Sequence, residues 1–391
     1  MIHREMTLDL EPVGPLGIIA HPSSTELARK VDWYIRKWRT GVEIKQDVAP
    51  FYSGYKKQTY LLDVGIPRFG SGEAKSVINE TIRGYDLYIV ADVTNYSLKY
   101  TICGHENHYS PDDIYQDIKR VIAACNGKAR RLNVIMPFLY ESRQHRRNSR
   151  ESLDCALMLQ ELVSMGVDNI LTFDAHDPRV QNAIPLSGFE TVRTTYQMIK
   201  SLLNTEQDLQ IDSDHMMVIS PDEGGMERAV YYANVLGLDL GMFYKRRDYT
   251  KIVGGKNPIV AHEFLGTDVA GKDMLIIDDM ISSGESMLEV AQALKKRNAR
   301  NIYMFSAFGL FTNGMKKFDE AYEQGLVKRV FTTNMIYQSE NLLKREYYVS
   351  VDMSKYIASL IECLNHDASI SELLDPYNKI VERVNEYREE R

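Results

Sequence analysis

Short runs of apolar residues alternate along the chain with longer segments whose apolar residues recur every three or four positions. The first pattern predicts buried strands, and the second predicts amphipathic helices that cover them. Strands are expected at residues 16–20, 87–91, 132–136, 170–174, 216–219, 242–244, 274–277 and 302–306. Because strands and helices alternate, the fold class that we expect is α/β, with mostly parallel β-sheets flanked by helices.

Helical signals are clearest in three places. The first helix follows the first predicted strand, and we expect its two tryptophans, Trp33 and Trp38, to pack in the core. The second helix begins at Pro111, because Ser110 can cap its first turn and two acids follow the proline. The third is the charged segment 376–391, whose apolar residues form one stripe.

Residues 166–176 and 298–308 are similar to each other in sequence. Each segment ends a helix and opens a strand, and the two share asparagine, isoleucine, phenylalanine and alanine at matching places. A chance similarity between two αβ units is the alternative. We favour two related α/β halves. The expected ranges are an N-terminal domain at 14–188, a C-terminal domain at 189–375 and a helical tail at 376–391.

The composition of the 391-residue chain narrows the classes of function. A formal net charge of −7 argues against nucleic acid as the main partner. The four cysteines are scattered, without the spacing of a metal or redox motif, which is typical of reduced thiols. No apolar run approaches a signal segment or a membrane span. We therefore expect a soluble cytoplasmic protein with neither nucleic acid nor membrane as a partner.

The segment 274–290 carries the most chemistry. An apolar run ends in the adjacent acids Asp278 and Asp279, and a loop of small residues then leads into a helix. Such a loop presents backbone N–H groups and hydroxyls to a phosphate, aided by the positive end of the helix dipole. Two carboxylates beside it can accept hydrogen bonds from the vicinal hydroxyls of a sugar. An ordinary strand-to-helix turn with a solvated acidic pair is the alternative.

This segment resembles the 5-phosphoribosyl-1-diphosphate (PRPP) motif of phosphoribosyltransferases and ribose-phosphate diphosphokinases. In that family the two acids hold the ribose 2- and 3-hydroxyls, and the loop holds the 5-phosphate. Two residues depart from the usual motif, because Ser282 replaces an acid and Glu285 replaces a glycine. We expect the Glu285 side chain to point outward, since a carboxylate that faced the phosphate would repel it. The resemblance implies that ribose 5-phosphate is bound by Asp278, Asp279, Ser282, Ser283, Gly284, Glu285 and Ser286.

Residues 67–73 are similar to a hairpin of ribose-phosphate diphosphokinases that reaches into the ATP site of a neighbouring subunit. Phe69 would stack near the adenine and Glu73 would bond its polar edge, with Ser71 and Gly72 between them. Ser71 replaces the usual aspartate. A surface hairpin without a ligand is the alternative.

The segment 142–147 is similar to the Ala-Arg-Gln-Asp-Arg-Arg stretch of the same enzymes, so Arg143 and Gln144 are implied in ATP binding. Guanidinium groups suit this role because they make planar, paired contacts with phosphate oxygens. His145 replaces the family's aspartate, and its role stays open. A basic cluster is usually a solvated loop, but this one follows a predicted strand, where α/β proteins bind ligands.

Two further segments imply a metal site and the catalytic groups. His176 and Asp222 follow predicted strands and match the family's metal-binding histidine and aspartate, which implies Mg²⁺. A lone histidine is more often structural, and the pairing with Asp222 is what favours the metal. Residues 243–248 match the start of the family's mobile catalytic loop, so Lys245 and Arg247 would neutralise charge on the transferred diphosphoryl group. A basic surface turn is the alternative.

Together the resemblance implies two tandem phosphoribosyltransferase-like domains, with the ATP-side motifs in the first and the ribose 5-phosphate loop in the second. It implies transfer of the β,γ-diphosphoryl group of Mg-ATP to the 1-hydroxyl of ribose 5-phosphate, giving PRPP and AMP, in a homo-oligomer such as a dimer or hexamer. Two alternatives remain open. One is a phosphoribosyltransferase that consumes PRPP, and the other is a catalytically weak regulatory paralogue.

Overall fold

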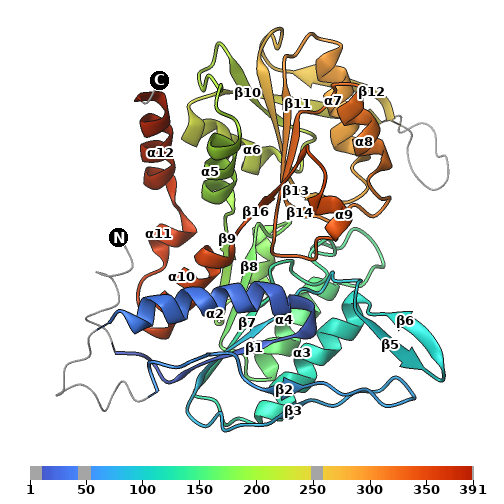
Figure 1. Ribbon diagram of the computed structural model, residues 1–391. Coiled ribbons are helices and arrows are strands. Elements are labelled where there is room, and N and C mark those ends of the chain that lie inside the picture. Colours follow the sequence, from blue (N-terminus) through green and yellow to red (C-terminus); the bar gives the residue numbers. More distant parts are fainter. Residues whose placement is uncertain (1–10, 43–53, 248–258, 390–391) are drawn as a thin grey trace. The chain divides into compact units, whose positions relative to one another are not determined.

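The chain forms two compact units, each built around its own β-sheet (Figure 1). The computed structural model describes residues 11–42, 54–247 and 259–389. The first unit contains Met1–Arg193, Asn334–Tyr337 and Asp352–Asp375, and the second contains Thr194–Thr333, Gln338–Val351 and Pro376–Arg391. The α/β fold class predicted from the sequence is confirmed.

The sheet of the first unit has five parallel strands in the order β1-β4-β7-β8-β9. Their bounds are β1 (Leu16–Ala20), β4 (Asp86–Val90), β7 (Arg131–Ile135), β8 (Asn169–Phe173) and β9 (Gly188–Val192). Every residue of β4 is buried, as expected where helices cover both faces of a parallel sheet. The helices of this unit are α2 (Thr25–Thr40), α3 (Pro111–Cys125), α4 (Asp154–Ser164), α10 (Ser354–Asn365) and the short α11 (Ser371–Leu374), with 3₁₀ turns η1 (Pro22–Ser24) and η3 (Pro178–Ala183).

Two antiparallel pairs accompany the first sheet. One joins β2 (Val64–Gly65) to β3 (Val77–Ile78), and the chain between them contains the hairpin predicted at 67–73. The other joins β5 (Lys99–Ile102) to β6 (His105–His108). The predicted start of α3 is confirmed, because the Ser110 hydroxyl accepts the Asp113 N–H and the Asp113 carboxylate accepts the Ser110 N–H.

The sheet of the second unit has seven strands in the order β12-β11-β10-β13-β14-β15-β16, and only the β11–β12 pair is antiparallel among these neighbours. The strands are β10 (Met216–Ser220), β11 (Asp239–Arg247), β12 (Ile259–Leu265), β13 (Asp273–Ile281), β14 (Ile302–Gly309), β15 (Arg329–Thr333) and β16 (Tyr348–Val351). The helices are α5 (Thr195–Thr205), α6 (Met226–Leu236), α7 (Glu285–Lys295), α8 (Lys316–Glu323), α9 (Glu340–Leu343) and α12 (Tyr377–Glu389).

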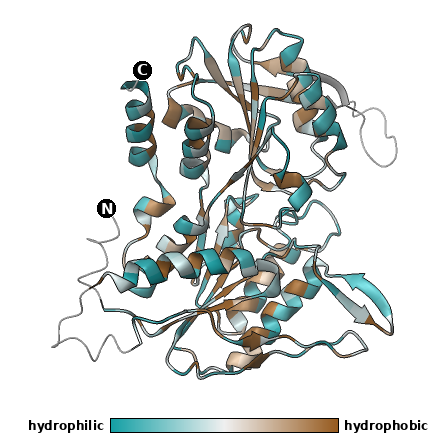
Figure 2. Ribbon diagram, viewed as in Figure 1, coloured by the Kyte–Doolittle hydropathy of each residue, from teal (hydrophilic) through white to brown (hydrophobic). Residues whose placement is uncertain are grey.

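The central strands of this second sheet contribute to two separate cores because successive side chains point to opposite faces. Leu275 and Ile277 pack in the cluster that includes residues of α5, α6 and α12. Met274 and Ile276 pack in the cluster that includes residues of α7 and α8. Figure 2 shows the corresponding pattern of apolar strands and mainly hydrophilic visible faces on α2 and α12. Among the helices that the structure describes, none combines the length and apolarity needed to span a membrane.

The predicted C-terminal tail is an integral part of the second unit. Its stripe of Ile380, Val384 and Tyr387 is buried in the cluster with α5 and α6. The Tyr387 hydroxyl donates to the carbonyl of Glu206 at 3.1 Å and accepts the N–H of Leu209 at 3.3 Å. The tail therefore supplies buried core residues to the second unit as well as an outer helix.

The structure groups the chain differently from the predicted domain ranges of 14–188, 189–375 and 376–391. Residues 352–375 belong to the first unit, where the guanidinium of Arg39 lies 2.9 Å from the carboxylate of Glu362. The predicted boundary after residue 188 falls inside β9, which is the last strand of the first sheet. A pattern read along the sequence cannot reveal that the chain crosses back in this way.

Three local expectations also need correction. The strand predicted at 274–277 runs on to Ile281, so the acid pair lies within β13. The strand predicted at 242–244 is the middle of the nine-residue β11. We expected Trp33 and Trp38 in the core, but Trp33 is 47% exposed and Trp38 is only partly buried, and neither belongs to the buried face of α2.

Candidate active site

The predicted phosphate loop lies where β13 gives way to α7. The loop between the strand and the helix is Ser282, Ser283 and Gly284, and the helix begins at Glu285. Gly284 has a φ of 80°, and a Cβ atom there would lie 2.3 Å from the ring of Phe318. Glycine is therefore required for this turn. Glu285 and Ser286 belong to the first turn of α7. The loop therefore leads directly into the N-terminus of the helix, whose unpaired N–H groups can bind an anion.

The acid pair of β13 is a site of unfavourable negative charge. Asp279 is buried and Asp278 is half-buried, and the Asp279 N–H donates to Asp278 Oδ1 at 2.9 Å. Burial, and then the charge of Asp279, raise the pKa of Asp278 well above its ordinary value. Sugar hydroxyls that donate to these oxygens, or a cation beside them, would relieve this charge.

Asp222 lies at the same edge of the second sheet. It follows β10, which pairs in parallel with β13, so the carboxyl ends of both strands meet there. Asp222 Oδ1 accepts the N–H groups of Gly224 at 2.9 Å and Gly225 at 3.2 Å, which fixes the carboxylate. The negative charge of Asp222 contributes to the raised pKa of Asp278. The structure therefore brings together the two acids and Asp222, which were assigned separate roles from the sequence.

The Glu285 carboxylate turns toward α8. Its Oε1 accepts a hydrogen bond from Lys317 Nζ at 2.6 Å, and both side chains are about half exposed. The hydrogen bond from Lys317 lowers the pKa of Glu285. This geometry agrees with the outward placement expected from the sequence, because the extra charge has its own partner.

If Glu285 stays outward when ribose 5-phosphate binds, its replacement should change sugar phosphate affinity only modestly, by less than about threefold. Glu285→Ala, Glu285→Gln and Glu285→Gly should be compared by calorimetry, because glycine alone could loosen the first turn of α7. Lys317→Ala is the matched control, since it removes the partner and leaves the carboxylate. A gain of about tenfold or more in all three Glu285 variants, roughly 1.4 kcal/mol, would place the carboxylate next to the phosphate.

In the first unit, the tip of the hairpin at 67–73 is closed by its own hydrogen bonds. The Phe69 N–H donates to the Glu73 carbonyl at 2.7 Å, and the Gly72 N–H donates to the Phe69 carbonyl at 2.9 Å. Gly72 has a φ of 92°, which favours glycine at this position. The Ser71 hydroxyl donates to the Glu73 carboxylate at 2.9 Å, and the Phe69 side chain is 52% exposed. An exposed aromatic ring beside a carboxylate can contact a flat polar ligand such as a base.

The predicted residues Arg143 and Gln144 lie in the segment that follows β7, and His176 lies in the loop after β8. Arg143 and His176 are exposed, and the Gln144 amide donates to the Ser152 carbonyl at 2.8 Å. The rings of His145 and His176 are 5.2 Å apart. Since β7 and β8 are parallel neighbours, these residues gather at one edge of the first sheet.

Asp177 is a member of this cluster that the sequence analysis missed. His145 Nε2 lies 3.6 Å from Asp177 Oδ2, and Arg179 binds both carboxylate oxygens at 2.9 and 2.6 Å. Hydrogen bonds from Arg179 lower the pKa of Asp177 to about 2. The only signal in the sequence was its position directly after His176. His145, whose role was left open, therefore has a charged partner from the next loop.

Lys245 and Arg247 lie in β11, where their backbone pairs with β12. The register places Lys245 opposite His262 and Arg247 opposite Ile259, with an irregularity between Arg246 and Arg247. The side chains of Lys245 and Arg247, and residues 248–258 of the predicted catalytic loop, lie outside what the structure describes. Their proposed roles therefore rest on the sequence motif and on its place at the end of this strand.

The chemistry of the acid cluster in the second unit fits a hard cation. Asp222, Asp278 and Asp279 offer carboxylate oxygens, which Mg²⁺ prefers, and their mutual repulsion would fall when a cation binds. No group of three or more histidine, cysteine or acidic side chains is arranged as a complete metal cage among the described residues. Mg²⁺ bound with substrate phosphates needs only one or two protein ligands. The predicted pair of His176 and Asp222 is divided between the two units.

Comparison with known proteins agrees with this arrangement of motifs. Residues 16–166 match the N-terminal domain of ribose phosphate pyrophosphokinase, and residues 184–339 match the phosphoribosyl transferase domain. The chain belongs to the ribose-phosphate pyrophosphokinase family. Family members from Vibrio parahaemolyticus and Shewanella oneidensis are 26% and 29% identical to this chain. Those two alignments cover 81% and 80% of this chain and 92% and 90% of the relatives.

The same family is represented among solved structures. The crystal structure of phosphoribosylpyrophosphate synthetase from Mycobacterium smegmatis superimposes with a TM-score of 0.69 at 19% identity. The superposition covers 90% of this chain and 99% of that one. At this level of identity the likeness supports the fold, which is the two-domain fold expected from the sequence.

Proposed function

We propose that this chain is a ribose-phosphate diphosphokinase, which converts ATP and ribose 5-phosphate into AMP and PRPP. Two observations, one on each unit, together carry the proposal. The second unit presents an acid pair followed by a glycine-dependent loop at the start of α7, while the first unit matches the N-terminal domain of ribose phosphate pyrophosphokinase. Phosphoribosyltransferases normally have a single domain of this type, so the first unit favours diphosphate transfer over use of PRPP.

The reaction is an in-line displacement at the β-phosphorus of ATP. The 1-hydroxyl of ribose 5-phosphate forms a bond to this phosphorus, and the bond from the β-phosphorus to the oxygen of the α-phosphate breaks. AMP leaves with the electron pair, and the proton of the hydroxyl is released to solvent. Positioning and charge stabilisation supply most of the rate enhancement in such a transfer.

We assign the sugar to the second unit. Asp278 and Asp279 accept hydrogen bonds from the 2- and 3-hydroxyls, which stabilises the carboxylates against the burial and the mutual repulsion that raise the pKa of Asp278. The 5-phosphate binds to the loop of Ser282, Ser283 and Gly284 and to the first turn of α7. In this role Ser282 supplies a hydroxyl donor where other motifs carry an acid, which adds no negative charge beside the phosphate.

We assign the adenine of ATP to the hairpin tip, with Phe69 against its face and Glu73 at its polar edge. We assign the phosphates of ATP to Arg143 and Gln144.

Lys245 and Arg247 would stabilise the charge that develops on the diphosphoryl group. We assign His176 of the first unit and Asp222 of the second to Mg²⁺ binding, and the ion would neutralise part of the ATP charge when bound. If the hairpin reaches into the ATP site of a neighbouring subunit, the active protein is a homo-oligomer, either a dimer or a hexamer.

We further propose a cytoplasmic location, because all four cysteines are free thiols.

The proposal is tested by measuring AMP release from ATP in the presence of ribose 5-phosphate and Mg²⁺, with each component omitted in turn. Diphosphate transfer requires all three. A phosphoribosyltransferase would instead form a nucleotide from PRPP and a nucleobase without ATP. A regulatory paralogue, suggested by His145 and the other residues that depart from the family motifs, would bind the substrates and release AMP slowly or not at all.

Asp222→Asn and His176→Ala are expected to raise the Mg²⁺ concentration needed for half-maximal activity by about tenfold. The first change removes a negative charge from a hard-cation site, and the second removes a ligand. Asp268→Asn and His105→Ala are matched controls, because both residues are exposed and outside the proposed site. Activity titrations with an unchanged Mg²⁺ requirement in both test variants would remove these residues from the metal site.

A further inference from the structure

The Arg68 side chain occupies the base of the hairpin tip and is nearly buried, with 8% of it exposed. Its Nη1 donates to the carbonyl of Gly72 at 3.0 Å, across the loop formed by residues 69–73. The backbone of Arg68 pairs with Ala74 on the opposite arm of the hairpin. One guanidinium therefore bonds to the loop that carries Phe69 and Glu73.

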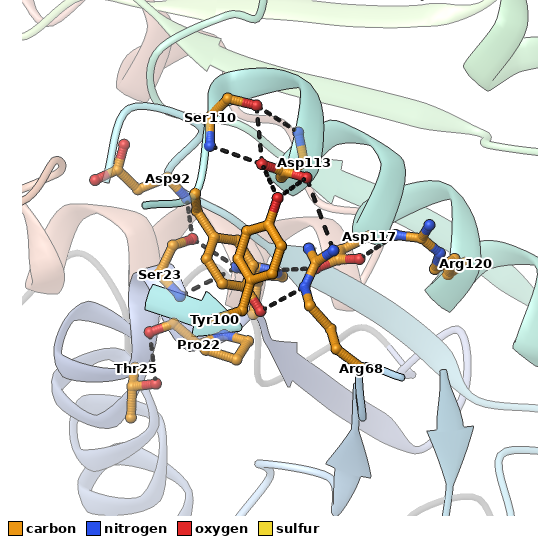
Figure 3. Close-up of polar contacts among 12 residues, drawn as sticks. Pro22, Ser23, Thr25, Arg68, Asp92, Tyr100, Ser110, Asp113, Asp117 and Arg120 are labelled. Carbon is orange, nitrogen blue, oxygen red and sulfur yellow. Dashed lines mark hydrogen bonds and ion pairs between the residues drawn. The ribbon is translucent and has the colours of Figure 1, made fainter. Parts of the chain in front are cut away.

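The same guanidinium connects the tip to helix α3. Arg68 Nη2 donates to Asp117 Oδ2 at 3.1 Å, while Arg120 Nη1 donates to Asp117 Oδ1 at 2.5 Å (Figure 3). Burial would raise the pKa of Asp117, but hydrogen bonds from His21 and Arg120 and the charge of Arg68 hold it below its ordinary value. Asp117 is thus a buried, charged anchor within a helix.

Two tyrosine rings pack against the guanidinium of Arg68. The guanidinium carbon of Arg68 lies 4.2 Å from the ring centre of Tyr100 and 4.4 Å from that of Tyr109. Arg68 Nε also donates to the Tyr109 hydroxyl at 3.0 Å. The tip has a second attachment on this side, because the Cys103 N–H donates to the Gly70 carbonyl at 2.8 Å.

We propose that Arg68 is a positioning residue that fixes the hairpin tip in the orientation in which Phe69 and Glu73 receive the adenine of ATP. Each of its nitrogens donates to a different group, namely the tip, α3 and Tyr109, and only a planar fork of donors can do this. A tip that is already fixed loses less entropy when ATP binds, which strengthens binding without a direct contact. This inference rests on the proposed function and adds to it a residue that does not touch the nucleotide.

Arg68→Ala and Arg120→Ala form a matched pair, because each removes one guanidinium from Asp117 but only Arg68 bonds to the tip. We expect Arg68→Ala to raise the KM for ATP by about tenfold or more and to leave the KM for ribose 5-phosphate within about twofold. Arg120→Ala should leave both values within about twofold. Arg68→Lys should retain most of the defect, since one ammonium group cannot bond to the tip and the anchor together.

Tyr109→Phe provides a milder test if Arg68→Ala does not fold. It removes the hydroxyl that accepts from Arg68 Nε and should raise the KM for ATP by about threefold. Tyr100→Phe keeps the ring over the guanidinium and should have no such effect. The inference is overturned if Arg68→Ala, or in its place Tyr109→Phe, leaves the KM for ATP unchanged, or if Arg68→Ala and Arg120→Ala shift it equally. Wild-type protein that releases no AMP would instead overturn the proposed function, and the inference with it.

Discussion

Lys245→Ala is expected to lower turnover at least about a hundredfold while leaving nucleotide binding nearly intact. If Lys245 has the proposed role, the variant lacks a positive charge that stabilises the oxygen atoms gaining charge in the transition state, where one such donor contributes a factor of about a hundred to a thousand. Turnover should be measured as AMP release at saturating ATP and ribose 5-phosphate, and nucleotide binding by calorimetry. A fall in kcat without a matching change in KM is the signature of an interaction made only in the transition state.

Arg246→Ala is the control for Lys245→Ala, because the two residues are adjacent in β11 and have the same charge. The sequence motif assigns no role to Arg246, so this variant should keep turnover within about threefold of the wild type. Near-normal turnover in Lys245→Ala would remove that residue from the mechanism. Equal losses in both variants would indicate a general effect of positive charge on this strand.

Asp278→Asn is expected to raise the KM for ribose 5-phosphate and to lower kcat/KM by about a hundredfold. A hydrogen bond to a charged acceptor contributes roughly 1.5–3 kcal/mol, and an amide offers the sugar one acceptor oxygen where the carboxylate offers two. The KM for ATP should stay within about twofold, because we place the adenine in the first unit. An unchanged KM for ribose 5-phosphate would remove the acid pair from the sugar site.

The stability of Asp278→Asn should change in the opposite direction to its activity. The folded protein holds the proton of Asp278 more tightly than the unfolded chain does. The stability that this protonated side chain contributes is therefore lost as the pH rises through the raised pKa. Asparagine has no such titration, so at about pH 8 the variant should have a Tm equal to or above that of the wild type. A lower Tm together with lost activity would indicate damage to the fold instead.

The residues that depart from the family motifs are accommodated locally in three cases. Ser71 donates to Glu73, His145 lies 3.6 Å from Asp177, and Glu285 pairs with Lys317. Each of these three residues therefore lies near a charged group of the same unit. This pattern favours an enzyme with altered contacts over a paralogue that has lost its site.

The regular elements could be predicted because their signals are local. The eight expected strands all correspond to strands of the structure, seven of them with shifted ends, because buried apolar runs bounded by polar residues are a local signal in an alternating α/β chain. The cap of α3 was predictable from Ser110 and Pro111. The β5–β6 pair was missed because its residues are mostly polar, so neither strand shows an apolar alternation.

Features that depend on distant parts of the chain could not be predicted. Residues 352–375 return to the first unit through Glu362, which binds Arg39, and Asn365, which binds Arg39 and Asp86. The group around Arg68 joins a hairpin to Asp117 of α3, about fifty residues away, and no spacing rule relates them. The site residues could be proposed from the sequence because each lies at the end of a strand or in a recognisable motif. Arg68 itself lies in the hairpin motif, but its contacts with Asp117, Tyr100 and Tyr109 have no such signal.

The most direct test of diphosphate transfer is to follow the phosphorus atoms of ATP by ³¹P NMR after adding the protein, ribose 5-phosphate and Mg²⁺. Diphosphokinase activity predicts loss of ATP with equal gains of AMP and of a diphosphoryl group attached to the sugar. No reaction should occur without ribose 5-phosphate. Formation of ADP with a sugar monophosphoryl ester, or no change in ATP at all from folded protein, would contradict transfer of the β,γ-diphosphoryl group.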